Sequence, residues 1–286
     1  MHLGFSSMNT INDPTPTKLA PLLEAAGFES LWYGEHSHIP MSLKTPYPPG
    51  GDLPEPYKGM MDPYVSLTAA AAVTTHLKLG TGIALMLERD IFSQAKAMST
   101  LDRLSNGRLM IGTGVGWNQE EFENVSRLPW HRRYLGLKET VAATRTLFTE
   151  AEPAFQGELI QFDPVWFEPK PAQENGPPII FGAMGPLGIK HAAQWADGWM
   201  PVDIALPNIP QAISDFKKQV TELGRNASEV EITMVVMSEV TEDLLLSYQD
   251  MGIDRCNIGV GMANWDKPEI IEPMIQRFAD LTPRLK

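Results

Sequence analysis

Residues 101–122 read LDRLSNGRLMIGTGVGWNQEEF, and this stretch decides the fold. A helix end is followed by a Ser-Asn-Gly stop, a short apolar strand at residues 108–111, and glycine at every second position, Gly112, Gly114 and Gly116. Because glycine has no Cβ, such a loop lets a flat or phosphorylated molecule approach the backbone closely. The same loop is equally typical of a tight packing corner. It is not a dinucleotide fingerprint, because the third glycine at the required spacing is missing.

The strand and helix pattern of this stretch repeats along the chain. Strict alternation of eight strands with eight helices favours a parallel sheet closed into a (β/α)₈ (TIM) barrel, and an open doubly wound sheet is the alternative. Because no flexible linker divides residues 1–286, we expect a single domain. Residues 152–177 are expected to form an insertion after the fourth βα unit. The expected strands are residues 2–6, 30–36, 76–85, 108–112, 178–181, 197–201, 230–237 and 255–260. The expected helices are residues 16–27, 62–75, 91–104, 131–149, 187–195, 208–223, 242–251 and 268–281.

The composition excludes several classes of function. The net charge of -12 argues against a protein that binds nucleic acid or an anionic membrane through a broad basic face. The single cysteine, Cys256, excludes an intrachain disulfide framework, and the N-terminus lacks the features of a signal peptide. Apolar runs are too short to span a bilayer. These features indicate a cytoplasmic enzyme that acts on a small molecule.

In a (β/α)₈ barrel the site lies where the strands end and the βα loops begin. His36 and His38 follow the second expected strand, and the proline-rich loop of residues 37–61 after them is typical of a lid. The H-x-H pair invites a metal site, but no histidine follows His191 in the sequence, so we expect no metal. His36 is the candidate proton donor or acceptor, and a structural hydrogen bonder is the alternative.

A second loop of small residues follows the fifth expected strand. It contains Gly182, Ala183, Met184 and Gly185 and leads into a helix near Pro186. Free backbone N–H groups and the positive end of a helix dipole suit a phosphate there. An ordinary βα turn is the alternative.

Several motifs occur together in the order of a known family. They are GFESLW (27–32) with Glu35 and His36, Asp62-Pro63, LGTGI (79–83), TLDRLSNGR (100–108), GTGVGWNQEEF (112–122), FEPKP (167–171) and ADGW (196–199). The set resembles the luciferase-like monooxygenase superfamily, and within it the branch that uses the deazaflavin coenzyme F-420. The resemblance implies a (β/α)₈ barrel of the bacterial luciferase-like type, a flavin or deazaflavin in its mouth, and a homodimer.

The resemblance also implies roles for single residues. His36 would lie beside the ring system, and Gly82-Ile83 would form a bulge at the end of the third strand, where the family often has a non-prolyl cis peptide. Residues 114–117 would border the ring or its side chain, and residues 182–185 would bind the phosphate. The implied cofactor-binding residues are Glu35, Thr81, Gly82, Ile83, Gly114, Val115, Gly116, Trp117, Gly182, Ala183, Met184 and Gly185.

One departure from the family argues against a sugar phosphate as the substrate. Sugar-phosphate dehydrogenases of this branch place a carboxylate after the glycine loop, and Trp117 takes that position here. Glu120 and Glu121 follow, and they are equally well explained as helix-start carboxylates favoured by the helix dipole. The leading hypothesis is hydride transfer between coenzyme F-420 and a small organic substrate. The alternatives are a monooxygenase that uses reduced FMN and oxygen, and a barrel that binds a ligand without turnover.

Overall fold

The computed structural model describes residues 1–285, and it confirms the closed (β/α)₈ barrel. Eight parallel strands of these residues close in the order β1-β10-β9-β8-β7-β4-β3-β2. Because every barrel strand is parallel, all their carboxyl ends meet at one end of the barrel, which we call the mouth. The strands are β1 (His2–Ser7), β2 (Ser30–Tyr33), β3 (Lys78–Ala84), β4 (Leu109–Thr113), β7 (Ile179–Phe181), β8 (Gly198–Trp199), β9 (Glu231–Val235) and β10 (Arg255–Ile258).

Helices surround the barrel, and several begin at capping side chains that the sequence makes recognisable. Asp62 accepts a hydrogen bond from the Val65 N–H at the start of α2, and Asp90 caps α3 in the same way. No helix among residues 1–285 is both long and apolar enough to cross a bilayer. The helices are α1 (Pro16–Ala25), α2 (Pro63–Ala71), α3 (Ile91–Leu104), α4 (Gln119–Val125), α5 (Arg133–Thr149), α6 (Pro186–Trp195), α7 (Ile209–Glu222), α8 (Glu242–Asp250) and α9 (Ile271–Ala279).

The short helix α4 has no counterpart among the expected helices. It begins at Asn118, whose side-chain oxygen accepts a hydrogen bond from the Glu121 N–H at 3.1 Å. The sequence Asn-x-x-Glu is a helix-start signal, so this element was recognisable from the sequence. The helix matters for function because it carries Glu120 and Glu121 at the mouth.

Large side chains from a few strands fill the barrel interior, and glycines make room for them. Trp32, Met110, Ile180 and Met200 form the inner cluster, while a larger core lies between strands and helices. A Cβ at Gly80 would come within 2.2 Å of the Trp32 ring. Gly112 also has a packing cause: it lies on the same face of β4 as Met110, and a Cβ there would come 3.1 Å from Met200 Cε.

Gly112 provides a direct test of this packing. A Cβ at this position would lie 2.1 Å from the backbone oxygen of Thr81, which cannot move without displacing β3. We expect Gly112→Ala to lower the free energy of unfolding by about 3 kcal/mol, as overpacking does in rigid surroundings. Gly185→Ala is the matched control, because among the described residues no atom beyond its two chain neighbours lies within 4 Å of its new Cβ. Urea unfolding of both variants measures the difference, and equal stability would contradict the packing explanation.

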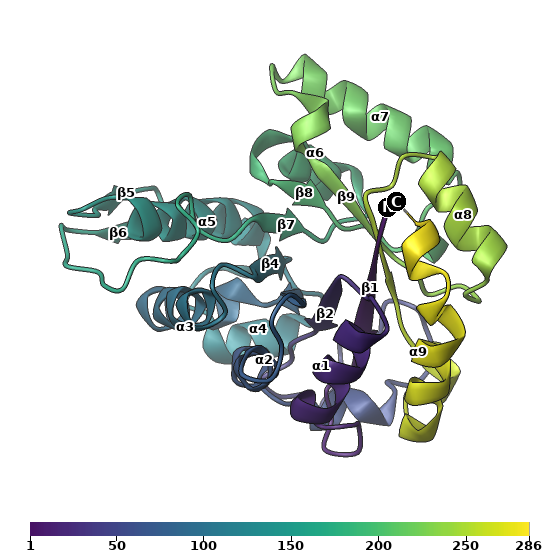
Figure 1. Cartoon of the computed structure of the whole chain (residues 1–286). Helices are drawn as coiled ribbons and strands as arrows, with labels where there is room; N and C mark the ends of the chain where they lie inside the picture. Colours follow the sequence, from purple (N-terminus) through teal and green to yellow (C-terminus); the bar gives the residue numbers. More distant parts are fainter. Residues whose placement is uncertain (286) are drawn as a thin grey trace.

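A two-stranded hairpin lies outside the barrel, within the expected insertion. Strands β5 (Phe155–Gln156) and β6 (Gln161–Phe162) pair antiparallel, and Figure 1 shows the hairpin beside α5 at one side of the molecule. The chain ends lie together, as the N and C labels in Figure 1 show. The Met1 amino group donates a hydrogen bond to the Leu285 carbonyl oxygen at 3.0 Å.

Candidate active site

A histidine–carboxylate pair lies buried at the mouth. His36 follows β2, and its Nδ1 lies 2.5 Å from Oε2 of Glu121 in the first turn of α4. The other carboxylate oxygen accepts a hydrogen bond from the Ser37 N–H at 3.1 Å. Glu121 is fully buried, and the His36 side chain is only 8% exposed. Because the Glu121 carboxylate accepts the hydrogen bond of Nδ1–H, we assign the proton of the neutral His36 ring to Nδ1. Nε2 is then the ring nitrogen available for proton exchange.

Four aromatic side chains form a connected cluster beside His36, and we call them the aromatic lid: Tyr47, Tyr57, Trp117 and Trp265. The rings of Tyr57 and Trp117 contact the His36 ring edge to face, with centroids at 5.3 and 5.7 Å. Tyr47 contacts both of them, and Tyr57 also contacts Trp265 at 5.8 Å. The lid joins three segments that are distant in sequence: the loop of residues 37–61, the glycine loop after β4, and the loop after β10.

Glu120 holds the loop of residues 37–61 against α4. Its carboxylate accepts hydrogen bonds from the Thr45 N–H at 3.1 Å and from the Lys44 N–H at 2.6 Å, and also from the Thr45 hydroxyl. The Thr45 hydrogen bond and these backbone donors lower the pKa of Glu120 below its usual range. The two carboxylates that the sequence left open thus differ in position: Glu121 binds His36, and Glu120 anchors the loop.

The end of β3 carries the bulge that the family resemblance implies. The register with β4 shifts between Thr81 and Ala84, and the Gly82–Ile83 peptide bond is cis. The Thr81 hydroxyl donates to the Gly112 carbonyl oxygen at 2.7 Å, and Thr81 is fully buried. Gly82 is exposed, so its backbone is accessible at the mouth.

Ile83 brings the two glycine loops together. A Cβ at Gly114 would lie 2.4 Å from Ile83 Cδ1, and one at Gly182 would lie 3.0 Å from Ile83 Cγ2. Both glycines therefore have a packing role. The other residues of the second loop differ in exposure. Ala183 is buried, and its carbonyl oxygen accepts a hydrogen bond from Trp199 Nε1 at 2.7 Å. Met184 and Gly185 are exposed at the start of α6. In the first loop, Val115 and Gly116 are half-buried.

Glu35 binds other protein groups rather than lying open at the mouth. Its carboxylate accepts from the Leu85 N–H at 2.8 Å and from Arg89 Nε at 2.5 Å. Burial raises the pKa of Glu35 despite the attraction of Arg89. Direct cofactor binding by Glu35 remains a prediction from the sequence.

Glu88 is a third buried carboxyl beneath the glycine loop. Among residues 1–285, its Oε2 has no hydrogen-bond partner, and a Cβ at Gly116 would lie 3.5 Å from its Oε1. Burial, followed by the charges of Glu121 and Glu35, raises the pKa of Glu88 to about 8. Glu88 is therefore largely protonated at neutral pH.

This raised pKa makes the stability depend on pH. A group whose pKa is raised on folding contributes stability that is fully present below its unfolded pKa and is lost as the pH rises to its folded pKa, here between about 4.5 and 8. We expect Glu88→Gln to be more stable than the wild type at pH 9, by on the order of 2 kcal/mol, and to lose that advantage at pH 5. Thermal unfolding at both pH values measures it. The exposed Glu174→Gln should show no such divergence, and parallel pH curves for Glu88→Gln and wild type would contradict the assignment.

The two histidines of the H-x-H pair bind different partners. His38 Nε2 lies 2.9 Å from Asn124 Nδ2, and its Nδ1 lies 2.9 Å from the Ser37 hydroxyl, whereas His36 binds Glu121. In residues 1–285 there is no group of three or more histidine, cysteine, aspartate or glutamate side chains placed to hold a metal ion. The structure therefore places His36 and His38 in separate hydrogen-bond networks.

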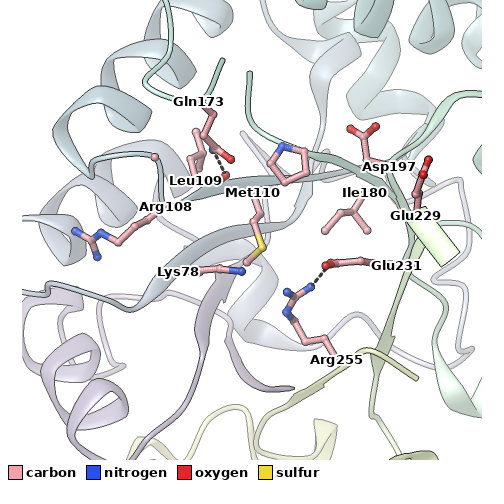
Figure 2. Close-up of a pocket in the computed structure, with 12 residues that line it drawn as sticks. Lys78, Arg108, Leu109, Met110, Gln173, Ile180, Asp197, Glu229, Glu231 and Arg255 are labelled. Carbon is pink, nitrogen blue, oxygen red and sulfur yellow. Dashed lines mark hydrogen bonds and ion pairs between the residues drawn. The ribbon is translucent and has the colours of Figure 1, made fainter. Parts of the chain in front are cut away.

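A cavity of about 200 Å³ lies at the opposite end of the barrel, far from the candidate site. Figure 2 shows Met110 and Ile180 within it and the ion pair of Arg255 with Glu231 at its side. Arg255 is 1% exposed, and Glu29 binds its guanidinium through both carboxylate oxygens, at 2.8 and 2.9 Å. Because residues at the amino ends of barrel strands serve stability, we assign this network to the fold.

A closed (β/α)₈ barrel with a buried histidine–carboxylate pair at its mouth has the arrangement of a barrel enzyme. Residues 15–244 match the family model described as luciferase-like monooxygenase. The chain belongs to the luciferase-like monooxygenase family, as the motifs predicted.

Three other proteins are similar to the chain, one in sequence and two in fold. An uncharacterised protein of Mycobacterium tuberculosis (strain ATCC 25618 / H37Rv) is 37% identical over 221 residues, which cover 76% of this chain and 78% of that protein. The monooxygenase RslO1 from Streptomyces bottropensis is similar in structure, with a TM-score of 0.73 at 20% identity and full coverage of both chains. An F-420-dependent secondary alcohol dehydrogenase, solved with an F-420–acetone adduct, has a TM-score of 0.73 at 18% identity, covering 100% of this chain and 99% of that one.

The sequence interpretation missed part of the site. It left the role of Glu121 open, and it assigned no function to Tyr47, Tyr57 and Trp265. The Asn-x-x-Glu start of α4 could have placed Glu121 on a helix at the mouth, but nothing in the sequence indicates that it contacts His36. The aromatic residues carry no local signal, because single aromatic residues in loops are common.

Proposed function

We propose that this protein is a deazaflavin (coenzyme F-420)-dependent oxidoreductase that transfers a hydride to or from a small organic substrate. The observation that carries the proposal is the buried His36–Glu121 pair at the barrel mouth, with aromatic rings beside His36. Membership of the luciferase-like family supports an oxidoreductase. The cytoplasmic location and the homodimer expected from the sequence belong to the same proposal.

The residues at the mouth fit a flat, phosphorylated cofactor. The backbone of Gly82 is accessible at the end of β3, and no described atom beyond its two chain neighbours lies within 4 Å of the position that a Cβ of Gly185 would occupy at the start of α6. Ile83 and Trp117 would border the ring system, and the α6 N-terminus with Gly185 would bind the phosphate. The cofactor would supply hydride chemistry at this position.

The chain itself would bind, shield and move a proton. His36 Nε2 would exchange a proton with the substrate oxygen, while Glu121 holds the imidazole in one tautomer and stabilises its charged form. The aromatic lid would exclude water from the reacting atoms, and Glu120 would hold the loop of residues 37–61 closed over them.

A cofactor titration tests the proposal. Purified protein is titrated separately with F-420 and with FMN, and binding is followed by fluorescence quenching. We expect saturable F-420 binding and substrate-dependent cofactor turnover that does not require oxygen. Gly185→Val should weaken F-420 binding at least tenfold without changing the unfolding midpoint, because the new side chain would cover the α6 N-terminus.

The other outcomes identify the alternative functions. Saturable FMN binding with oxygen consumption would instead establish the monooxygenase reaction, for which the similarity to RslO1 is the present support. Absence of binding by both cofactors would overturn the proposal and leave a ligand-binding barrel. Normal F-420 binding by Gly185→Val would overturn the phosphate assignment alone.

A further inference from the structure

Apart from the Glu121 carboxylate at Nδ1, the neighbours of His36 in the aromatic lid are rings rather than charged groups. Tyr57 and Trp117 contact His36 directly, and Tyr47 and Trp265 extend the aromatic surface outward from them. Burial raises the pKa of the Tyr57 hydroxyl, so this group is neutral in the working range. A ligand beside His36 would therefore meet aromatic faces and edges, with neutral hydroxyl and indole groups as hydrogen-bonding partners.

The cations on the lid segments are directed to other partners. Lys58, the residue after Tyr57, pairs with Glu55, and Lys267, two residues after Trp265, donates to the Asn264 side-chain oxygen at 2.9 Å. Lys44 is exposed, and its backbone N–H binds Glu120. A phosphorylated or carboxylated substrate would thus enter the lid without Lys58 or Lys267 to replace its hydration, which is costly.

The lid also controls access. The His36 side chain is 8% exposed in the present arrangement, so rings of the lid must separate before a substrate reaches it. Tyr57 and Trp265 belong to two different loops, which meet at the contact of these rings at 5.8 Å and at the Tyr47 hydroxyl, 3.8 Å from Met262 Sδ. A flat, apolar molecule between Tyr57 and Trp265 would replace the ring–ring contact with apolar contacts of its own. A highly hydrated molecule would not make such contacts.

We propose that the aromatic lid selects a neutral substrate with a flat, apolar body and places its one reactive oxygen, a ketone carbonyl or the corresponding alcohol hydroxyl, at His36 Nε2. This inference rests on the proposed function and names its substrate class. In the reducing direction the carbonyl carbon would gain a hydride, hence two electrons, from the reduced deazaflavin, which would be left oxidised, and the oxygen would gain the proton of His36. The C=O double bond would become a C–O single bond, and solvent would return the proton to His36. Tyr57 and Trp265 are the specificity-determining residues.

Binding of two contrasting probes tests the proposal without relying on turnover. Acetophenone, a neutral aryl ketone, and glucose 6-phosphate, an anionic sugar, are added to the protein with and without oxidised F-420, and binding is measured by calorimetry. We expect acetophenone to bind and glucose 6-phosphate not to bind. Trp265→Ala and Tyr57→Ala should each weaken acetophenone binding at least tenfold, while Tyr57→Phe, which keeps the ring, should bind within twofold of the wild type.

Trp166→Ala is the matched control, because this tryptophan is 95% exposed in the insertion and lies outside the lid. It should leave acetophenone binding unchanged. Absence of acetophenone binding under both conditions, tighter binding of glucose 6-phosphate, or normal acetophenone affinity in Trp265→Ala and Tyr57→Ala would overturn the proposal. Failure of the cofactor assignment can be distinguished from failure of this proposal. It appears as absence of F-420 binding in the fluorescence titration, regardless of how acetophenone and glucose 6-phosphate bind.

Discussion

Glu121→Gln is expected to lower turnover about 100-fold while leaving cofactor affinity within threefold of the wild type. The carboxylate 2.5 Å from His36 Nδ1 holds the imidazole in one tautomer and stabilises its charged form, and the amide loses that charge. Steady-state kinetics and the fluorescence titration provide the two measurements. The separation of kcat from affinity distinguishes a role in proton exchange from a role in binding.

A double-mutant cycle makes this prediction sharper. His36→Ala should reduce turnover by about 10²–10⁴, the range of general acid–base catalysis. Because Glu121 acts through His36, adding Glu121→Gln to His36→Ala should cost nothing further. Additive losses in the double variant would mean that the two residues act independently. Glu123→Gln, on the exposed side of α4, serves as the control and should retain full activity.

Arg255→Leu is expected to lower the free energy of unfolding by about 3–5 kcal/mol, the cost of removing one partner from a buried ion pair. The guanidinium binds Glu29 through two hydrogen bonds and Glu231 at 3.1 Å, and it lies over the Trp32 ring at 5.7 Å. Its loss leaves Glu29 without its principal partner. Urea unfolding measures the effect, and Lys78→Met, which removes a half-exposed partner of Glu29, should cost less than about 1 kcal/mol.

The pH dependence of the free energy of unfolding tests whether the ion pair of Arg255 with Glu29 causes this stabilisation. Burial alone would raise the pKa of Glu29, but the hydrogen bond and charge of Arg255 lower it to about 2. A group whose pKa is lowered on folding contributes stability that is present above its unfolded pKa and is lost as the pH falls to its folded pKa, here from about 4.5 to 2. Arg255→Leu should therefore show a shallower loss of stability on acidification. Adding Glu29→Gln should recover part of the stability, and a further loss would contradict the ion-pair explanation.

The two ends of the barrel thus have different tasks. At the base, a buried charged network joins β10 to the residues before β2, and it faces the cavity of about 200 Å³. At the mouth, the strand ends carry His36, the β3 bulge and the glycine loops. A substitution at the base is expected to change stability, whereas one at the mouth changes turnover or binding.

The sequence by itself determined the fold class and most of the elements. Alternating periodicity, helix caps such as Asp62 and turns such as Ser-Asn-Gly are local signals, because they depend on residues within a few positions of one another. The family motifs added the barrel type and the bulge at Gly82–Ile83, and both are present. The glycine alternation was also visible, but its packing cause was not, because Ile83 and Thr81 belong to another strand.

Only the tertiary structure decided how the candidate site is assembled. His36 and Glu121 are 85 residues apart in the chain and meet because β2 ends and α4 begins at the same mouth. The aromatic lid joins Tyr57 to Trp265 across most of the sequence, and Glu120 and Glu121, adjacent in the chain, point to different partners because successive helical residues face different directions. Such contacts depend on closure of the barrel, which brings distant strand ends together, and no local pattern of residues records them.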